Sequence, residues 1–149
     1  MRKVVVLISL LVLFLLLEPT PVYKGCGFLN HLIFHFYHAN IWHLLGNGLC
    51  IYAMKRMNWA VAYVIAVVCS FAIVSPTVGM SGIIFAAIGI RMGCFANVKG
   101  LWRCCISAIL FGLLPGVSLV FHLLSLLAGF AYGYSCTKYR LRGGFRPSK

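Results

Sequence analysis

Acidic residues are almost absent from this sequence, because Glu18 is the only one among 149 residues. Charged residues make up 9% of the chain, whereas hydrophobic residues make up 62%. A water-facing surface needs many more charges, so this balance excludes an ordinary soluble domain. We therefore expect an integral, multi-pass membrane protein whose surface is covered mostly by membrane lipid.

Cysteine pairs of the kind that bind zinc or build a disulfide framework are also missing. The seven cysteines are odd in number and form no C-x-x-C motif, so neither a zinc knuckle nor a disulfide scaffold is indicated. We expect free thiols that pack as small hydrophobic side chains. Internal repeats and low-complexity tracts are not apparent, and we expect residues 1–149 to form a single domain.

Basic residues are plentiful, and they give the chain a formal net charge of +12. They occur as small clusters between hydrophobic stretches, at Arg2-Lys3, Lys55-Arg56, Lys99 with Arg103, and the tail from Lys138 onward. A nucleic-acid partner is not expected, because the clusters form neither one face nor one long block. Such clusters are typical of topology signals on the cytoplasmic side of a membrane.

The apolar runs predict an all-α fold, a bundle of six transmembrane helices with both termini cytoplasmic. An even number of spans puts all the basic clusters on one side and leaves Lys24 on the other. The run after Arg2-Lys3 has no small-x-small cleavage site behind it, so we interpret it as the first span rather than a signal peptide. The expected spans are about 4–20, 34–54, 58–75, 81–98, 101–115 and 117–137.

The tetrad Gly79-Met80-Ser81-Gly82 lies between a break at Pro76 and the fourth apolar run. A small polar residue at this place predicts a helix N-cap. The alternative is a nucleophile in the first helical turn, where the helix dipole favours developing negative charge. The tetrad alone leaves both interpretations open. Gly79 and Gly82 would let backbone and substrate approach the serine.

The topology brings further polar residues to the depth of Ser81. His122 precedes Lys138 by 16 residues, which corresponds to roughly 24 Å of helix, and Ser81 lies roughly 27 Å above Lys99 by the same rise. His43 and Asn47, at i and i+4, share one face of the second span. All three polar side chains are expected in the outer half of the bundle.

Small residues on the fourth and sixth spans would allow these two helices to pack closely. They recur at Ser125, Gly129 and Gly133 in one span and at Gly82, Ala86, Gly89 and Gly93 in the other. Such stripes let helices approach one another in a membrane. If they face each other, His122 lies across from Ser81.

These residues suggest a catalytic serine. His122 could take the proton of the Ser81 hydroxyl, and with no carboxylate nearby the pair would be a Ser–His dyad. Phe85, one turn after Ser81, could pack on the imidazole instead. The Ser81 N–H, His43 and the Asn47 amide are candidate donors to an oxyanion.

Three motifs in this order resemble the rhomboid intramembrane serine proteases: His38-x4-His43-x3-Asn47, Gly79-x-Ser81-Gly82, and His122 followed by small residues. The resemblance covers about residues 34–133. It implies a serine endopeptidase that cleaves transmembrane or juxtamembrane segments of other membrane proteins, without a cofactor or metal.

The resemblance also implies a role for each site residue. Ser81 would be the nucleophile and His122 the general base. His43 and Asn47 would join the Ser81 N–H in the oxyanion hole, and His38 would support them. Phe85 would stack on the catalytic histidine.

The loop 18–30 departs from the family, since it is shorter than the first loop of well-known bacterial members and lacks their Trp-Arg motif. The short chain suggests a minimal six-helix bacterial type. Its expected location is the inner membrane, with the active site towards the outer side.

Three other functions fit parts of the pattern. The helical spacing of His31, His35 and His38 could indicate a metal site, although no H-E-x-x-H motif and few acidic ligands are present. An inactive rhomboid-like protein could act as a binding or quality-control factor. A small transporter would need a charged residue at mid-membrane, where only Arg91 comes near.

Overall fold

The computed structural model describes residues 2–16, 18, 20–54, 57–112 and 118–142. This part of the chain is all-α, as predicted, and its only strand-like pairing is an isolated bridge between Val22 and Thr77. The elements are α1 (Arg2–Leu16), α2 (Phe28–Ile33), the 3-10 helix η1 (Phe34–Phe36), α3 (Ile41–Ala53), α4 (Trp59–Ser70), α5 (Ser81–Cys94), α6 (Val98–Gly112) and α7 (Leu119–Arg142).

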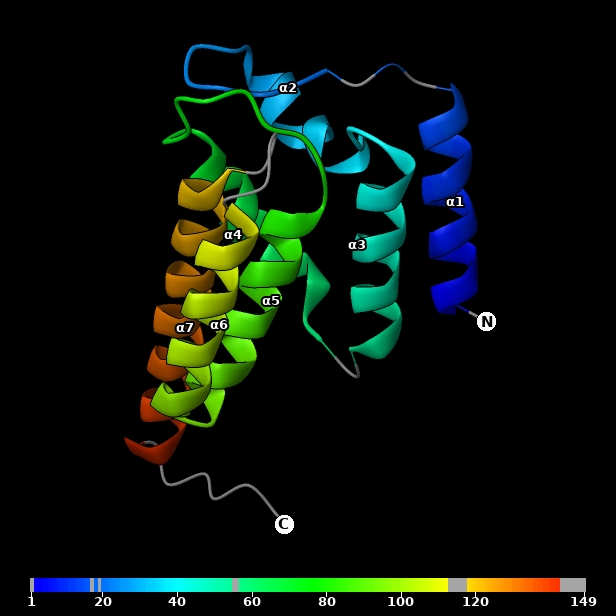
Figure 1. The fold of residues 1–149 in the computed structure, drawn as a ribbon. Coiled ribbons are helices and arrows are strands. Elements are labelled where there is room, and N and C mark those ends of the chain that lie inside the picture. The colour runs from blue at the N-terminus through cyan, green and yellow to red at the C-terminus, as the bar shows by residue number, and fades with distance from the viewer. Residues whose placement is uncertain (1, 17, 19, 55–56, 113–117, 143–149) are drawn as a thin grey trace.

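The long helices form a bundle in which successive helices run in alternating directions (Figure 1). Helix α1 begins and α7 ends at the same end of the bundle, and the short α2 lies at the opposite end. Within the described residues, one helical segment, Leu119–Tyr139 of α7, is long and apolar enough to cross a membrane. Helices α4 and α5 are apolar but shorter. The other predicted crossings and the cytoplasmic termini stay predictions.

The second predicted span, 34–54, differs from one continuous helix. The chain forms η1, passes through extended backbone at Tyr37, and begins α3 only at Ile41. Asn40 explains this break, because its backbone is extended (φ −162°, ψ 170°) and its side-chain oxygen accepts the His43 N–H at 2.9 Å. An asparagine in this position caps a helix start. His38 therefore precedes the helix that carries His43.

Helices α5 and α7 pack in backbone contact along the predicted stripes of small residues. A Cβ atom at Gly129 would collide with the Ala86 carbonyl, and one at Gly133 would collide with that of Ile90. A Cβ atom at Gly89 would likewise collide with the Leu126 carbonyl of α7. The predicted facing of the two stripes is confirmed at these positions. Close helix approach through small residues is what such spacing permits.

The short first loop is tied to the segment that precedes α5. Val22 donates its N–H to the Thr77 carbonyl at 2.8 Å and accepts the Thr77 N–H at 3.0 Å. Lys24 donates its N–H to the Ile73 carbonyl. Val22 and Thr77 are both buried. These bonds fix the backbone that leads into Ser81.

Candidate active site

Ser81 and His122 meet where α5 and α7 begin. Ser81 is the first residue of α5, and its Oγ lies 2.7 Å from Nε2 of His122, which sits in the first turn of α7. The predicted role of Ser81 as N-cap is wrong, because the cap residue is Met80 and no side chain caps this helix. The hydroxyl bonds to the imidazole instead. The two residues are 41 positions apart in the sequence, so only the helix packing joins them.

Phe85 holds the other face of the histidine. Its ring stacks on His122 with centroids 4.6 Å apart and an interplanar angle of 23°. His122 is 4% exposed, and its Nδ1 has no hydrogen-bond partner among the described residues. Ring stacking and packing therefore orient the imidazole where a triad would use a carboxylate.

Gly79 forms the turn that leads into the serine. Its φ of +106° lies in the region that favours glycine, and its N–H donates to the Phe34 carbonyl at 3.1 Å. A Cβ atom here would lie 2.6 Å from Cε1 and 2.9 Å from Nε2 of His43. The turn thus needs glycine for its conformation and for the space that the His43 ring occupies.

Hydrogen-bond donors gather beside this turn. The Asn47 Nδ2 atom would lie 3.5 Å from a Cβ at Gly79 and has no partner within the described part of the chain. The Nε2 of His43 borders the same glycine. Since Ser81 opens α5, its N–H has no acceptor inside the helix. The arrangement can supply backbone and side-chain donors to a negative oxygen near Ser81.

Two other predicted site residues, His38 and Gly82, pack against residues near the serine and histidine. His38 is buried, and its ring meets that of His43 edge-on at a centroid distance of 5.3 Å. Gly82 lies against the ring of Phe121, which would overlap a Cβ atom there. His38 thus packs against His43, and Gly82 leaves room for the Phe121 ring.

His31 and His35, whose spacing with His38 could indicate a metal site, lie inside the protein. Both side chains are buried. Nδ1 of His31 is 2.7 Å from Oγ of Ser70, and the ring centroids of His35 and Phe34 are 3.9 Å apart. Burial lowers the pKa of His31 below its ordinary value, which favours the neutral ring. No three His, Cys, Asp or Glu side chains in the described ranges come together as a metal site.

Phe121 is a contributor to the site that the sequence reasoning missed. Its side chain is fully buried, with its ring 5.6 Å from that of Phe34 and 6.1 Å from that of His35. It therefore fills the space behind Gly82 and joins α7 to η1. The sequence signal that could have indicated Phe121 was its position directly before His122.

A cleft of about 530 Å³ opens onto Ser81 and His122. Trp42 and Cys50 of α3 line one side, and Cys104 and Ser107 of α6 line the other. Over the described residues, no Cα atom of α3 lies within 8 Å of a Cα atom of α6. The cleft thus lies between two helices, α3 and α6, whose backbones are well separated.

The comparisons with known proteins give one relationship. No protein-family model matches the chain, and no solved structure matches it. A protein of Acanthamoeba polyphaga mimivirus, named "Putative rhomboid protein", is 26% identical over 156 residues. The match covers 89% of this chain and 90% of the viral protein. Over nearly its whole length, the chain is therefore similar to a protein named as a rhomboid.

Proposed function

We propose that this protein is an intramembrane serine endopeptidase that cleaves transmembrane or juxtamembrane segments of other membrane proteins. The observation that carries the proposal is the 2.7 Å distance between Oγ of Ser81 and Nε2 of His122. A hydroxyl at this distance from an imidazole can be activated as a nucleophile. The donors beside Gly79 and the similarity to a rhomboid-named protein support the same chemistry.

The reaction follows from these positions. Oγ of Ser81 attacks the carbonyl carbon of the scissile peptide bond while His122 accepts the hydroxyl proton. The carbonyl oxygen becomes negative and accepts hydrogen bonds from the Ser81 N–H, His43 and Asn47. His122 then gives its proton to the leaving amine as the C–N bond breaks. A water molecule, deprotonated by His122, hydrolyses the acyl-enzyme ester and restores Ser81.

The membrane setting is part of the proposal. Six spans, both termini in the cytoplasm and a site towards the outer side agree with the basic clusters and with the alternating helix directions (Figure 1). The apolar length of α7 supports membrane insertion. The cleft between α3 and α6 is the route by which a transmembrane substrate would reach Ser81, and a bacterial inner membrane suits this arrangement.

A serine-reactive phosphonate probe tests the proposed nucleophile. The purified protein in detergent should be labelled, whereas Ser81→Ala and His122→Ala should not be. Ser75→Ala is the matched control, because Ser75 is exposed and lies outside the cleft; it should label like wild type. Labelling that survives Ser81→Ala would overturn the assignment. A folded wild-type protein that neither labels nor cleaves would instead favour the inactive rhomboid-like binding factor.

A further inference from the structure

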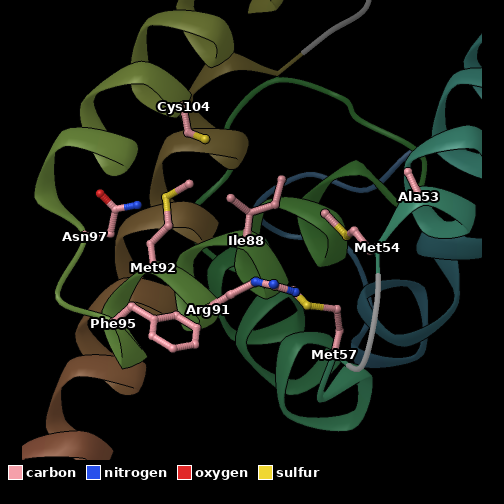
Figure 2. A pocket seen from close by; sticks show the side chains of 9 residues that line it. All are labelled: Ala53, Met54, Met57, Ile88, Arg91, Met92, Phe95, Asn97 and Cys104. Atoms are coloured by element: carbon pink, nitrogen blue, oxygen red, sulfur yellow. The ribbon is translucent and has the colours of Figure 1, made fainter. Parts of the chain in front are cut away.

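A second cavity lies further along α5 from Ser81, between α3, α5 and the first turns of α6 (Figure 2). Its volume is about 530 Å³, within the range of about 300–1,000 Å³ that is usual for ligand sites. The lining is largely apolar and includes the side chains of Met54, Met57 and Met92, with the charged Arg91 among them. The proposed peptidase reaction uses none of these four residues.

Arg91 gives the cavity a cationic edge. It follows Ser81 by ten residues on α5, which places it roughly 15 Å further along the helix axis. Its side chain is exposed and extends towards the side of the pocket formed by Met54 and Met57 (Figure 2). A guanidinium above apolar side chains matches a ligand with an anionic head and a hydrocarbon tail, because guanidinium binds phosphate through paired N–H donors.

The surrounding charge favours an anionic ligand over a zwitterionic one. Lys99 and Arg103 at the start of α6 and Lys138 near the end of α7 belong to the same end of the bundle (Figure 1). Helix α1 ends at the opposite end of the bundle (Figure 1), and the acidic Glu18 follows it in the sequence. In the proposed topology this basic end faces the cytoplasmic leaflet, where basic pockets between helices attract anionic headgroups.

The methionines suit a hydrocarbon chain. Their flexible thioether side chains adapt to ligands of irregular shape. Thioethers also bind soft ions such as Cu(I), but the positive charge of Arg91 beside Met54 and Met57 opposes a cation there. The lining therefore fits an acyl chain better than a metal ion.

We propose that this cavity binds one anionic phospholipid, with its phosphate on Arg91 and an acyl chain along Met57, Met92 and Phe95. The proposal rests on the membrane setting of the proposed function but not on the Ser–His dyad. It can therefore fail while the peptidase assignment stands.

Thermal unfolding of the full chain in a non-ionic detergent tests this site. Dioctanoyl phosphatidylglycerol should raise the Tm saturably, while dioctanoyl phosphatidylcholine and inorganic phosphate at equal concentration should not. Arg91→Gln should weaken the apparent affinity about tenfold or more, as expected for a hydrogen-bonded charge. Arg103→Gln, which removes an exposed charge outside the cavity, should change it less than twofold.

Two further variants keep the test decisive. Met92→Trp fills the cavity and leaves every charge in place, so it should also abolish the response, even if Arg91→Gln does not fold. Ser81→Ala should bind phosphatidylglycerol like wild type, which separates this site from catalysis. Equal losses in Arg91→Gln and Arg103→Gln, an unchanged response in Met92→Trp, or a full response to inorganic phosphate alone would each overturn the proposal.

Discussion

Gly129 of α7 lies directly against the backbone of Ala86 of α5, with no room for a Cβ atom between them. The contact belongs to a row in which glycines of each helix meet the backbone of the other, and Ala86 is the position of this row on α5 nearest Ser81. His122 lies seven residues before Gly129 and Ser81 five residues before Ala86. The spacing of the two helix axes therefore sets the distance between the serine and its histidine.

Gly129→Ala should destabilise the protein by about 1–3 kcal/mol, the usual cost of overpacking a tight contact. Gly46→Ala is the control, because a Cβ atom at this helical position meets no atom within 4 Å. The control should be neutral or stabilising by about 0.5–1 kcal/mol, since alanine favours helix. Thermal unfolding in detergent measures both. Equal unfolding midpoints for the two variants would contradict the role of the glycine row.

Gly79→Ala should abolish cleavage, because its Cβ would displace the His43 ring from the serine. Gly25→Ala is a matched control: Gly25 has a φ of +102° but open space around it. Both variants incur backbone strain of about 1–3 kcal/mol, so both lose stability. Only Gly79→Ala should lose cleavage per folded molecule. Parallel losses in the two variants would assign the effect to strain alone.

Asn47→Ala should lower the cleavage rate about 10²–10³-fold, the usual effect of removing one oxyanion donor. Asn58→Ala removes an amide of the same kind, which caps α4 by accepting the Val61 N–H at 3.3 Å. Loss of this cap costs about 0.5–2 kcal/mol of stability but should leave the rate per folded molecule unchanged. Cleavage by Asn47→Ala within a few-fold of wild type would remove Asn47 from the oxyanion hole.

The meeting of Ser81 and His122 could be predicted because it depends on features that a sequence carries. The basic clusters predict the direction of each expected span, and helical rise then predicts the depth of each side chain. The stripes of small residues supply the contact surface. The same reasoning could not give the burial of His31, because its partners Ser70 and Phe71 come from the end of α4, about 40 residues further along the chain.

The helix break before α3 was not predicted from the sequence, for a different reason. The histidines at 31, 35 and 38 follow a helical spacing up to it, and no proline interrupts the apolar run 34–54. The signal was Asn40, a strong N-cap residue, whose side chain accepts the His43 N–H. The apolar run 34–54 predicts one continuous span, whereas the capping preference of Asn40 determines where the helix begins.

Cleavage of a transmembrane model substrate by the purified protein in bilayers tests the central claim most directly. Wild type and Ser75→Ala should cleave, whereas Ser81→Ala and His122→Ala, each shown to be folded by thermal unfolding, should leave the substrate intact. Loss of both activities follows if Oγ of Ser81 attacks and Nε2 of His122 takes its proton. Cleavage retained by folded Ser81→Ala would contradict the account.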